Sequence, residues 1–384
     1  MAQTIDLDAL LDTIGPACAA GARERDETDG FVDDNYTLLK ENGAFAALVP
    51  ADLGGGGARH SELCAFLKGL AHYCPSTALA LSMHSHLVAA AVYNHRNGRP
   101  GKALLDKVAG GAVLVSTGAN DWLESNGTVE RVDGGYRVSA RKPFASGSPK
   151  GAAMVTSAPY DDPEHGWQVL HFPVPFSAEG VSLANDWQTM GMRATGSHTI
   201  VLDNVFVPDD AIALRRPRGQ FHMVWSVVLT VAMPLIMSVY AGVAEKAAGI
   251  ATGLAARRSG DPAVPYLLGE LTNLATTAQI AHADMVRLAN DLDFDATVEA
   301  ADAMLVRKSI CANAVIATTQ KAMEAAGGAG FFRVTGLERL VRDAQGARFH
   351  PLPEKRQQQF TGRLALGLDP VGDPVAPELR VAAE

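Results

Sequence analysis

The sequence predicts an α+β fold in which a middle antiparallel β barrel or sandwich separates an N-terminal helical domain from a C-terminal helical bundle. Three observations predict it. Residues 5–110 place apolar side chains at helical spacing, residues 112–213 alternate apolar and polar side chains, and the chain after Pro208 returns to long alanine-rich helical segments. We therefore expect domains at 1–111, 112–215 and 216–384 of this 384-residue chain.

The N-terminal region is predicted to form helices joined by short loops rich in glycine and proline. Apolar residues recur three and four positions apart in 7–20 and 33–43, and a further helix covers 76–93. That helix carries His84 and His86, whose i,i+2 spacing points them to different faces, so they cannot share one metal ion. A histidine on such a helix is more often a core residue than a catalytic one.

The middle region is predicted to contain short strands bounded by Gly, Asn, Asp and Pro. Segments with the period of a strand occur at 112–115, 135–138, 154–157, 167–170 and 199–202. Their number and spacing are typical of a small antiparallel barrel or sandwich.

The C-terminal region is predicted to form a bundle of long helices at 221–255, 266–291 and 297–326. Within it, residues 227–244 are apolar enough to raise the alternative of a membrane-spanning helix. Pro234 lies in their middle, and the flanks carry neither a basic cluster nor an aromatic belt. A buried core helix is therefore the favoured interpretation.

Composition excludes several functional classes. The formal net charge of -9 and the pI near 5.7 argue against a nucleic-acid or anionic-membrane partner. The four cysteines show no CxxC spacing and no histidine at ligand spacing, so neither a metal site nor a disulfide framework is expected. Residues 1–15 carry acidic rather than basic residues and no apolar run follows, so we predict a cytoplasmic protein.

Two runs of residues carry a family signature. The first is GMRATGS at 191–197 followed by DNVFVP at 203–208, and the second is GGAG at 327–330 followed by LERLVRDA at 337–344. Both resemble the acyl-CoA dehydrogenase superfamily, and the resemblance covers nearly the whole chain. It implies the same order of helical, β and helical domains, a flavin cofactor (FAD or FMN), and assembly as a homodimer or homotetramer.

The resemblance also implies which residues surround the flavin ring. The run KPFAS at 142–146 matches a strand whose aromatic and hydroxyl groups lie against the ring and its N5 edge, which assigns those places to Phe144 and Ser146. Trp187 is expected in the ring pocket, and Arg193 and Thr195 in the flavin and dimer environment. In the oxygenase branch of the superfamily a histidine on the 76–93 helix lies over the flavin, which would be His84 or His86.

Other positions are expected near more distant parts of the cofactor, and two of them keep a second interpretation. Asn120 either contacts the flavin, as an asparagine does in the oxygenase branch, or lies in a solvated turn. Arg257 either binds the flavin pyrophosphate of the next subunit, which its fork of donors suits, or is a solvated surface residue. Gly327 and Gly328 would let the backbone approach the flavin of the partner subunit.

One departure from the family determines the predicted chemistry. Aligned without gaps, the family's tyrosine and catalytic glutamate fall on His350 and Pro351, so the usual base is absent. Removing the α-proton of an acyl thioester needs a positioned base, and Glu354 is the only carboxylate close by in sequence. A monooxygenase that uses reduced flavin needs instead a dry apolar cavity, a hydrogen-bond donor near N5 and C4a of the flavin, and a histidine that exchanges a proton near neutral pH.

We therefore predict a two-component monooxygenase that oxygenates a small organic substrate through a C4a-hydroperoxyflavin, with reduced flavin supplied by a partner reductase. Its predicted catalytic residues are His350, Ser146, and His84 or His86. The alternative is an acyl-CoA dehydrogenase that oxidises the Cα–Cβ bond of an acyl thioester with bound FAD, using Glu354 or His350 as base. A non-enzymatic subunit that keeps the fold for assembly is a third possibility, because several family motifs are degraded.

Overall fold

Helices form the first part of the chain in the computed structural model, which describes residues 4–118 and 123–372. Asn120 lies outside the described residues. The N-terminal helices are α1 (Leu7–Ala19), α2 (Ala22–Thr28), α3 (Asp33–Glu41), α4 (His60–Tyr73), α5 (Pro75–Arg96) and α6 (Lys102–Ala109). Helix α5 begins at Pro75, whose fixed φ suits a first helical turn, and it is buried along most of its length. It therefore forms the inner layer of this region.

Two four-stranded sheets follow and enclose a second hydrophobic core. The strands are β1 (Leu114–Ser116), β2 (Thr128–Val132), β3 (Gly135–Lys142), β4 (Ala153–Asp162), β5 (Gly166–Pro175), β6 (Val181–Leu183), β7 (Ile200–Pro208) and β8 (Leu214–Pro217). Their orders are β1-β4-β5-β8 and β2-β3-β7-β6. Every pair is antiparallel except β1 and β4, which run parallel because β2, β3 and their turns form a long crossover between them.

The C-terminal part is a bundle built around α7 (Val224–Ala255), which packs against α4, α5, α8, α9 and α10. The remaining helices are α8 (Val264–Ala289), α9 (Val298–Ala326), α10 (Leu337–Ala344) and α11 (Glu354–Ala365). Helix α7 is the one described helix long and apolar enough to cross a membrane, but 94% of its most apolar window is buried inside the protein. The prediction of a core helix agrees with this burial.

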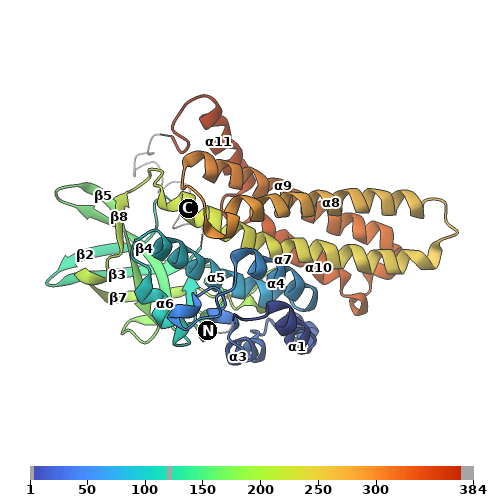
Figure 1. The fold of residues 1–384 in the computed structure, drawn as a ribbon, viewed down its shortest axis with the longest axis horizontal. Coiled ribbons are helices and arrows are strands. Elements are labelled where there is room, and N and C mark those ends of the chain that lie inside the picture. Colours follow the sequence, from blue (N-terminus) through green and yellow to red (C-terminus); the bar gives the residue numbers. More distant parts are fainter. Residues whose placement is uncertain (1–3, 119–122, 373–384) are drawn as a thin grey trace.

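The sheets and the far end of the bundle lie at opposite ends of the molecule (Figure 1). The N-terminal helices pack beside the near half of α7, while α7, α8 and α9 extend away from the sheets toward the turn between α7 and α8. The predicted fold class is confirmed: helices, then sheets, then a helical bundle.

Candidate active site

An exposed aromatic ring marks one wall of the candidate site. Directly after β3 the backbone turns at Phe144 with φ +60°, and the side chain stays 54% exposed. Its ring meets Trp187 edge to face, with centroids 5.7 Å apart. The Trp187 indole N–H donates to the Met192 carbonyl (3.2 Å), and its backbone N–H donates to His198 Nδ1 (3.1 Å). Two aromatic rings are thus held beside an open surface, as a planar ligand requires.

A chain of hydroxyl groups runs inward from this wall. Ser146 Oγ lies 2.8 Å from Ser197 Oγ, and Ser197 Oγ lies 2.7 Å from Thr195 Oγ1. The Thr195 hydroxyl donates to the Met192 carbonyl oxygen at 2.9 Å. All three side chains are buried, so the chain is shielded from bulk water. It links the turn after β3 to the loop that carries Trp187.

Helix α5 contributes two histidines with different surroundings. His84 is held through both ring nitrogens: Nε2 lies 2.8 Å from the Phe45 carbonyl, and Nδ1 accepts from the Leu114 backbone N–H at 2.9 Å. This arrangement ties α5 to β1 and leaves His84 no nitrogen for substrate chemistry. His86 Nδ1 is buried without a well-formed hydrogen bond to any described residue, although the Ser82 carbonyl one turn earlier lies near the ring. Burial lowers the pKa of both imidazoles to about 4.

A second group of candidate residues comes from the segment after α10. His350 Nε2 lies 2.8 Å from the hydroxyl of Tyr240, in the middle of α7, and the ring remains partly exposed. Enclosure by protein holds the pKa of His350 well below 6.5, and charges on Lys308 and His86 lower it further. His350 and His86 are therefore close enough for their charges to interact, although they come from opposite ends of the sequence.

Two buried charged side chains lie near His350 and Tyr240. Lys308 of α9 donates to the Leu352 carbonyl at 3.1 Å and is 1% exposed, and burial lowers its pKa to about 8. Asp343 of α10 accepts the Met192 backbone N–H, and burial raises its pKa to about 6. Burial and the negative charge of the Asp343 carboxylate both raise the pKa of Tyr240. Tyr240, Lys308 and Asp343 were not among the residues predicted for the site.

Glu354 does not join these groups. It begins α11, and its carboxylate accepts from the Asn313 side chain at 3.1 Å and from Lys355 and Gln358. These partners are exposed, so the carboxylate lies on the outer surface of α9 and α11. Helix α11 holds it there.

The residues predicted near the distant part of the cofactor form a separate group. Arg257 is exposed at the end of α7, roughly 25 Å along the helix from Tyr240 at 1.5 Å per residue. Gly327, with φ +63°, and Gly328 end α9 at the same tip. Arg258 rather than Arg257 covers this turn and donates to the Ala325 carbonyl. One chain therefore does not bring these residues to the aromatic wall.

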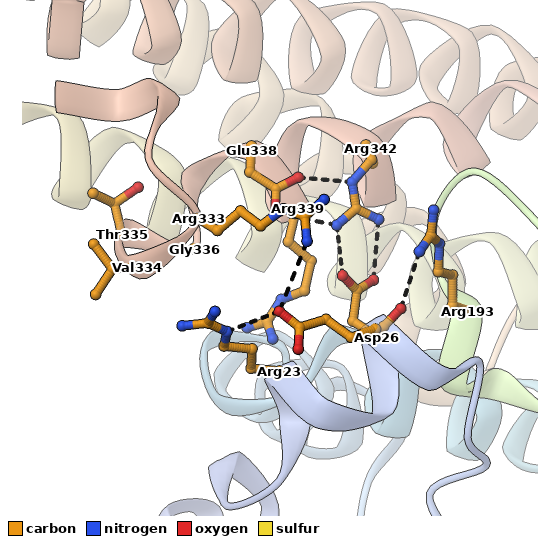
Figure 2. Close-up of a pocket in the computed structure, with 11 residues that line it drawn as sticks. Arg23, Asp26, Arg193, Arg333, Val334, Thr335, Gly336, Glu338, Arg339 and Arg342 are labelled. Carbon is orange, nitrogen blue, oxygen red and sulfur yellow. Dashed lines mark hydrogen bonds and ion pairs between the residues drawn. The ribbon is translucent and has the colours of Figure 1, made fainter. Parts of the chain in front are cut away.

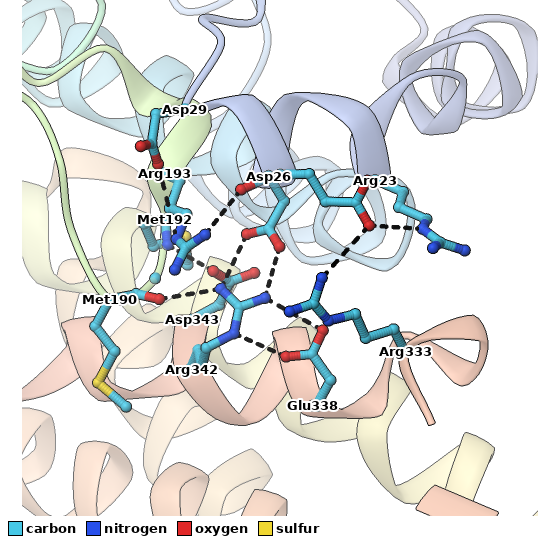
Figure 3. A network of polar contacts seen from close by, with 12 residues as sticks. Arg23, Asp26, Asp29, Met190, Met192, Arg193, Arg333, Glu338, Arg342 and Asp343 are labelled. Carbon is cyan, nitrogen blue, oxygen red and sulfur yellow. Dashed lines mark hydrogen bonds and ion pairs between the residues drawn. The ribbon is translucent and has the colours of Figure 1, made fainter. Parts of the chain in front are cut away.

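Arg193 faces the N-terminal helices (Figure 3). Its guanidinium donates to the carbonyls of Asp26 (3.1 Å) and Thr189 (2.9 Å). Arg342 of α10 forms a two-bond pair with the Asp26 carboxylate and also binds Glu338 and the Met190 carbonyl. Arg193 and Arg342 thus join α2, the loop 189–193 and α10.

This network borders an arginine-rich cavity of about 550 Å³ (Figure 2). The cavity lies between α2 and α10, and three acidic side chains offset most of its positive charge: Asp26, Glu27 and Glu338. Phe144, Ser146 and His350 do not line it. We interpret it as the open side of a structural ion-pair network.

Family models match most of both helical regions. The acyl-CoA dehydrogenase N-terminal domain matches residues 10–112, and the acyl-CoA dehydrogenase C-terminal domain matches residues 224–350. The chain belongs to the acyl-CoA dehydrogenase superfamily.

Similar proteins include an amino sugar nitrososynthase and an acyl-CoA dehydrogenase. The chain is 27% identical to the amino sugar nitrososynthase DnmZ of Streptomyces peucetius over 377 residues, or 93% of this chain and 92% of that protein. It is 23% identical to a cyclohex-1-ene-1-carbonyl-CoA dehydrogenase of Geobacter metallireducens, covering 95% and 98% of the two chains. The solved structure of KijD3 with FMN and a dTDP-linked amino sugar aligns with a TM-score of 0.83 and 27% identity, covering 98% and 97% of the two chains.

The residues of this acyl-CoA dehydrogenase fold fit a flavin. The exposed Phe144 ring, met edge to face by the half-buried Trp187, offers a surface for a planar ring, and Ser116 Oγ on β1 is buried without a hydrogen-bond partner among the described residues. Gly118 packs closely against Pro143 and Phe144, where a side chain would be tight, so the segment just after β1 lies beside Phe144. The predicted cofactor, FAD or FMN, is confirmed at the level of the family, and the solved structure of KijD3 holds FMN.

Proposed function

We propose that the chain is the oxygenase component of a two-component, reduced-flavin-dependent monooxygenase that acts on a small organic substrate. Bound reduced flavin would supply two electrons to dioxygen, so that one oxygen atom enters the substrate, the other leaves as water, and the flavin ends oxidised. A separate reductase would reduce the FAD or FMN. The protein must then bind the flavin, exclude water and manage protons.

The imidazole of His350 carries this proposal. It occupies the position that a dehydrogenase fills with the tyrosine before its glutamate, and Tyr240 holds it from α7. Its lowered pKa keeps the imidazole neutral near pH 7, so one ring nitrogen donates and the other accepts a hydrogen bond, and the ring can pass a proton on without holding it. Glu354, the sequence-based candidate for a carboxylate base, is bound at the outer surface instead.

The other residues have supporting roles. Phe144 and Trp187 would pack against the flavin ring, and Ser146 would hydrogen-bond its edge. His86, with a nitrogen that lacks a well-formed partner, would handle a proton together with His350. His84 would position α5 against β1 rather than act on substrate.

An amine is the substrate class to test first. DnmZ, an amino sugar nitrososynthase, and KijD3, whose solved structure holds a dTDP-linked amino sugar, both align with the chain along nearly its full length. An exposed amine on a sugar nucleotide is a nucleophile that can accept an oxygen atom.

The test supplies the purified protein with FMN or FAD, a flavin reductase, NADH and ¹⁸O₂, together with a panel of nucleotide-linked amino sugars. We expect a product that gains one labelled oxygen atom per turnover, and no product without the reductase. Substrate desaturation under nitrogen, with bleaching of bound FAD by an acyl-CoA, would contradict the proposal.

An acyl-CoA dehydrogenase is the second candidate, and Asp343 is the observation that favours it. This carboxyl is buried near Tyr240, with its pKa raised to about 6, as a general base often is. Its Oδ1 already accepts from the Met192 backbone, which indicates a structural role. An Asp343→Asn variant that keeps its fold and its oxygen-dependent activity would remove this candidate.

A further inference from the structure

The buried hydroxyl chain Ser146–Ser197–Thr195 has a direction that the structure fixes. It ends at the Met192 carbonyl oxygen, which carries no hydrogen. Two oxygen atoms 2.9 Å apart need a proton between them, so the Thr195 hydroxyl must donate to that carbonyl. Thr195 then has only lone pairs to offer Ser197.

The same reasoning passes outward along the chain. Ser197 must donate its hydrogen to Thr195 across 2.7 Å, and Ser146 must donate its hydrogen to Ser197 across 2.8 Å. Each hydroxyl has one hydrogen, and all three are used. The outer end of the chain, at Ser146, therefore presents lone pairs.

Burial keeps this direction from reversing. Ser146, Ser197 and Thr195 are 8%, 3% and 0% exposed, so water is not at hand to replace a broken bond. Reversal would rotate three hydroxyls together and set the lone pairs of Thr195 against those of the Met192 carbonyl. The Trp187 indole and the Thr195 backbone N–H also donate to that carbonyl and hold it in place.

We infer that Ser197 and Thr195 are positioning residues that make Ser146 a hydrogen-bond acceptor toward the flavin, so that the site favours reduced over oxidised flavin. The inference rests on the proposed function, which places Ser146 at the N5 edge of the ring. Reduced flavin carries N5–H, a donor that complements the Ser146 lone pairs. Oxidised flavin has an acceptor nitrogen there, which the same lone pairs repel.

This direction revises the role predicted for Ser146 from the sequence. A hydrogen-bond donor beside N5 was expected, and the hydroxyl chain leaves an acceptor. The family motif locates the serine, but only the spacing of Ser197 and Thr195 behind it determines which way its hydrogen points.

The test measures flavin affinity, not turnover. Wild-type protein is titrated anaerobically with oxidised FMN, with dithionite-reduced FMN and with oxidised 5-deaza-FMN, which carries C–H in place of N5. We expect reduced FMN to bind about tenfold more tightly than oxidised FMN, which would raise the midpoint potential of bound flavin by about 30 mV. Oxidised 5-deaza-FMN should bind at least as tightly as oxidised FMN.

Three variants separate the hydroxyl chain from general effects on packing. Ser197→Ala frees the Ser146 hydrogen and should reduce the preference for reduced FMN to within about threefold. Thr195→Val should have the same effect, whereas Thr195→Ser, which keeps the hydroxyl, should retain the wild-type preference for reduced FMN. Ser148→Ala is the matched control, because Ser148 is a buried serine of the same turn that donates to the Gly196 carbonyl outside the chain.

Each result decides the inference. Tighter wild-type binding of oxidised FMN than of 5-deaza-FMN would show that Ser146 donates, and would overturn it. An unchanged preference in folded Ser197→Ala and Thr195→Val proteins would also overturn it while leaving the monooxygenase proposal standing. No binding of either flavin state by the wild-type protein would overturn both proposals.

Discussion

His350 is the residue on which the proposed chemistry depends. We expect His350→Ala to lower the rate of product formation by about 10²-fold, because removal of a proton-transfer group costs roughly this factor. Reduced flavin would still be consumed, so the ratio of product to flavin oxidised falls. The measurement is product formed per NADH consumed. His165→Ala, in the exposed β4–β5 turn, is the control and should match wild type. Unchanged coupling in His350→Ala would exclude the assigned role.

Buried histidines also predict a pH dependence of stability. The pKa values of His84 and His86 are about 4, and the pKa of His350 is also lowered, whereas an unfolded histidine titrates near 6.5. Below about pH 6.5 the unfolded chain binds protons that the folded chain does not, so the free energy of unfolding should fall as pH falls. The raised pKa of Asp343 has the opposite sign and offsets part of the loss between about pH 4 and 6.

Urea unfolding at pH 7.5, 6.5 and 5.5 measures this dependence. Each buried histidine contributes up to about 1 kcal/mol per pH unit to the slope. His84→Gln removes one titrating group and should flatten the profile by that amount, after its own loss of stability at pH 7.5 is subtracted. A wild-type stability that rises on acidification over this range would contradict the burial described.

Sequence patterns locate some site residues and cannot distinguish others. Phe144, Ser146 and Trp187 follow from short motifs, and the structure places Phe144 and Trp187 in contact. His84 and His86 are indistinguishable by spacing, because only tertiary contacts with Phe45 and Leu114 occupy both nitrogens of His84. Tyr240 was not predicted for the site because it lies within an apolar run, although it is the only tyrosine in residues 227–244.

At the scale of elements, an ion-pair network joins α2, the loop 189–193 and α10. Arg342 and Asp26 are 20% and 12% exposed, and their paired side chains connect parts of the chain 316 residues apart. Arg342→Ala leaves Asp26 without its guanidinium partner. We expect it to cost roughly 3 kcal/mol of unfolding free energy, because a largely buried pair loses one member.

Chemical denaturation of three variants tests this expectation. Arg342→Lys keeps the charge but not the two-bond geometry, so its loss should be intermediate. Arg23→Ala removes an exposed i,i+4 pair with Glu27 and should cost less than about 1 kcal/mol. If Arg342→Ala and Arg23→Ala lower the free energy of unfolding equally, burial of the Arg342–Asp26 pair adds nothing to stability.

Element positions were predicted most closely where periodicity is long. The bundle helices expected at 221–255, 266–291 and 297–326 are observed as α7, α8 and α9 within three residues at each end. The strands β2, β6 and β8 were not predicted, because they are short and their residues are largely exposed. The parallel pairing of β1 with β4 depends on a distant crossover that local pattern does not encode.

At the scale of the whole molecule, the cofactor residues predicted for one chain lie in two separate regions of the fold. Arg257, Gly327 and Gly328 are at the tip of the bundle, far from Phe144, so a single flavin would need two subunits to meet both groups. Assembly as a homodimer or homotetramer therefore remains our prediction, as does a cytoplasmic location.

Co-expression of two defective chains tests this arrangement. Phe144→Ala should weaken flavin binding at the ring end and Arg257→Glu at the other end, so each variant alone binds little flavin. In a twofold assembly, each flavin site combines the Phe144 region of one chain with the Arg257 region of its partner. Random pairing makes about half of the dimers mixed, and each mixed dimer has one intact site out of two. The mixture should therefore hold roughly a quarter of the flavin of the wild-type protein. Flavin content of the purified mixture no higher than that of either variant alone would place the whole site within one chain.

The central claim is that this acyl-CoA dehydrogenase fold activates oxygen with reduced flavin. The most direct test is stopped-flow mixing of protein and anaerobically reduced FMN or FAD with oxygenated buffer, following flavin absorbance without substrate. We predict that protein-bound flavin reoxidises at least about tenfold more slowly than free flavin, because a dry site with a neutral histidine controls proton transfer. Reoxidation at the rate of free flavin, together with bleaching of bound FAD by an acyl-CoA under nitrogen, would contradict the claim.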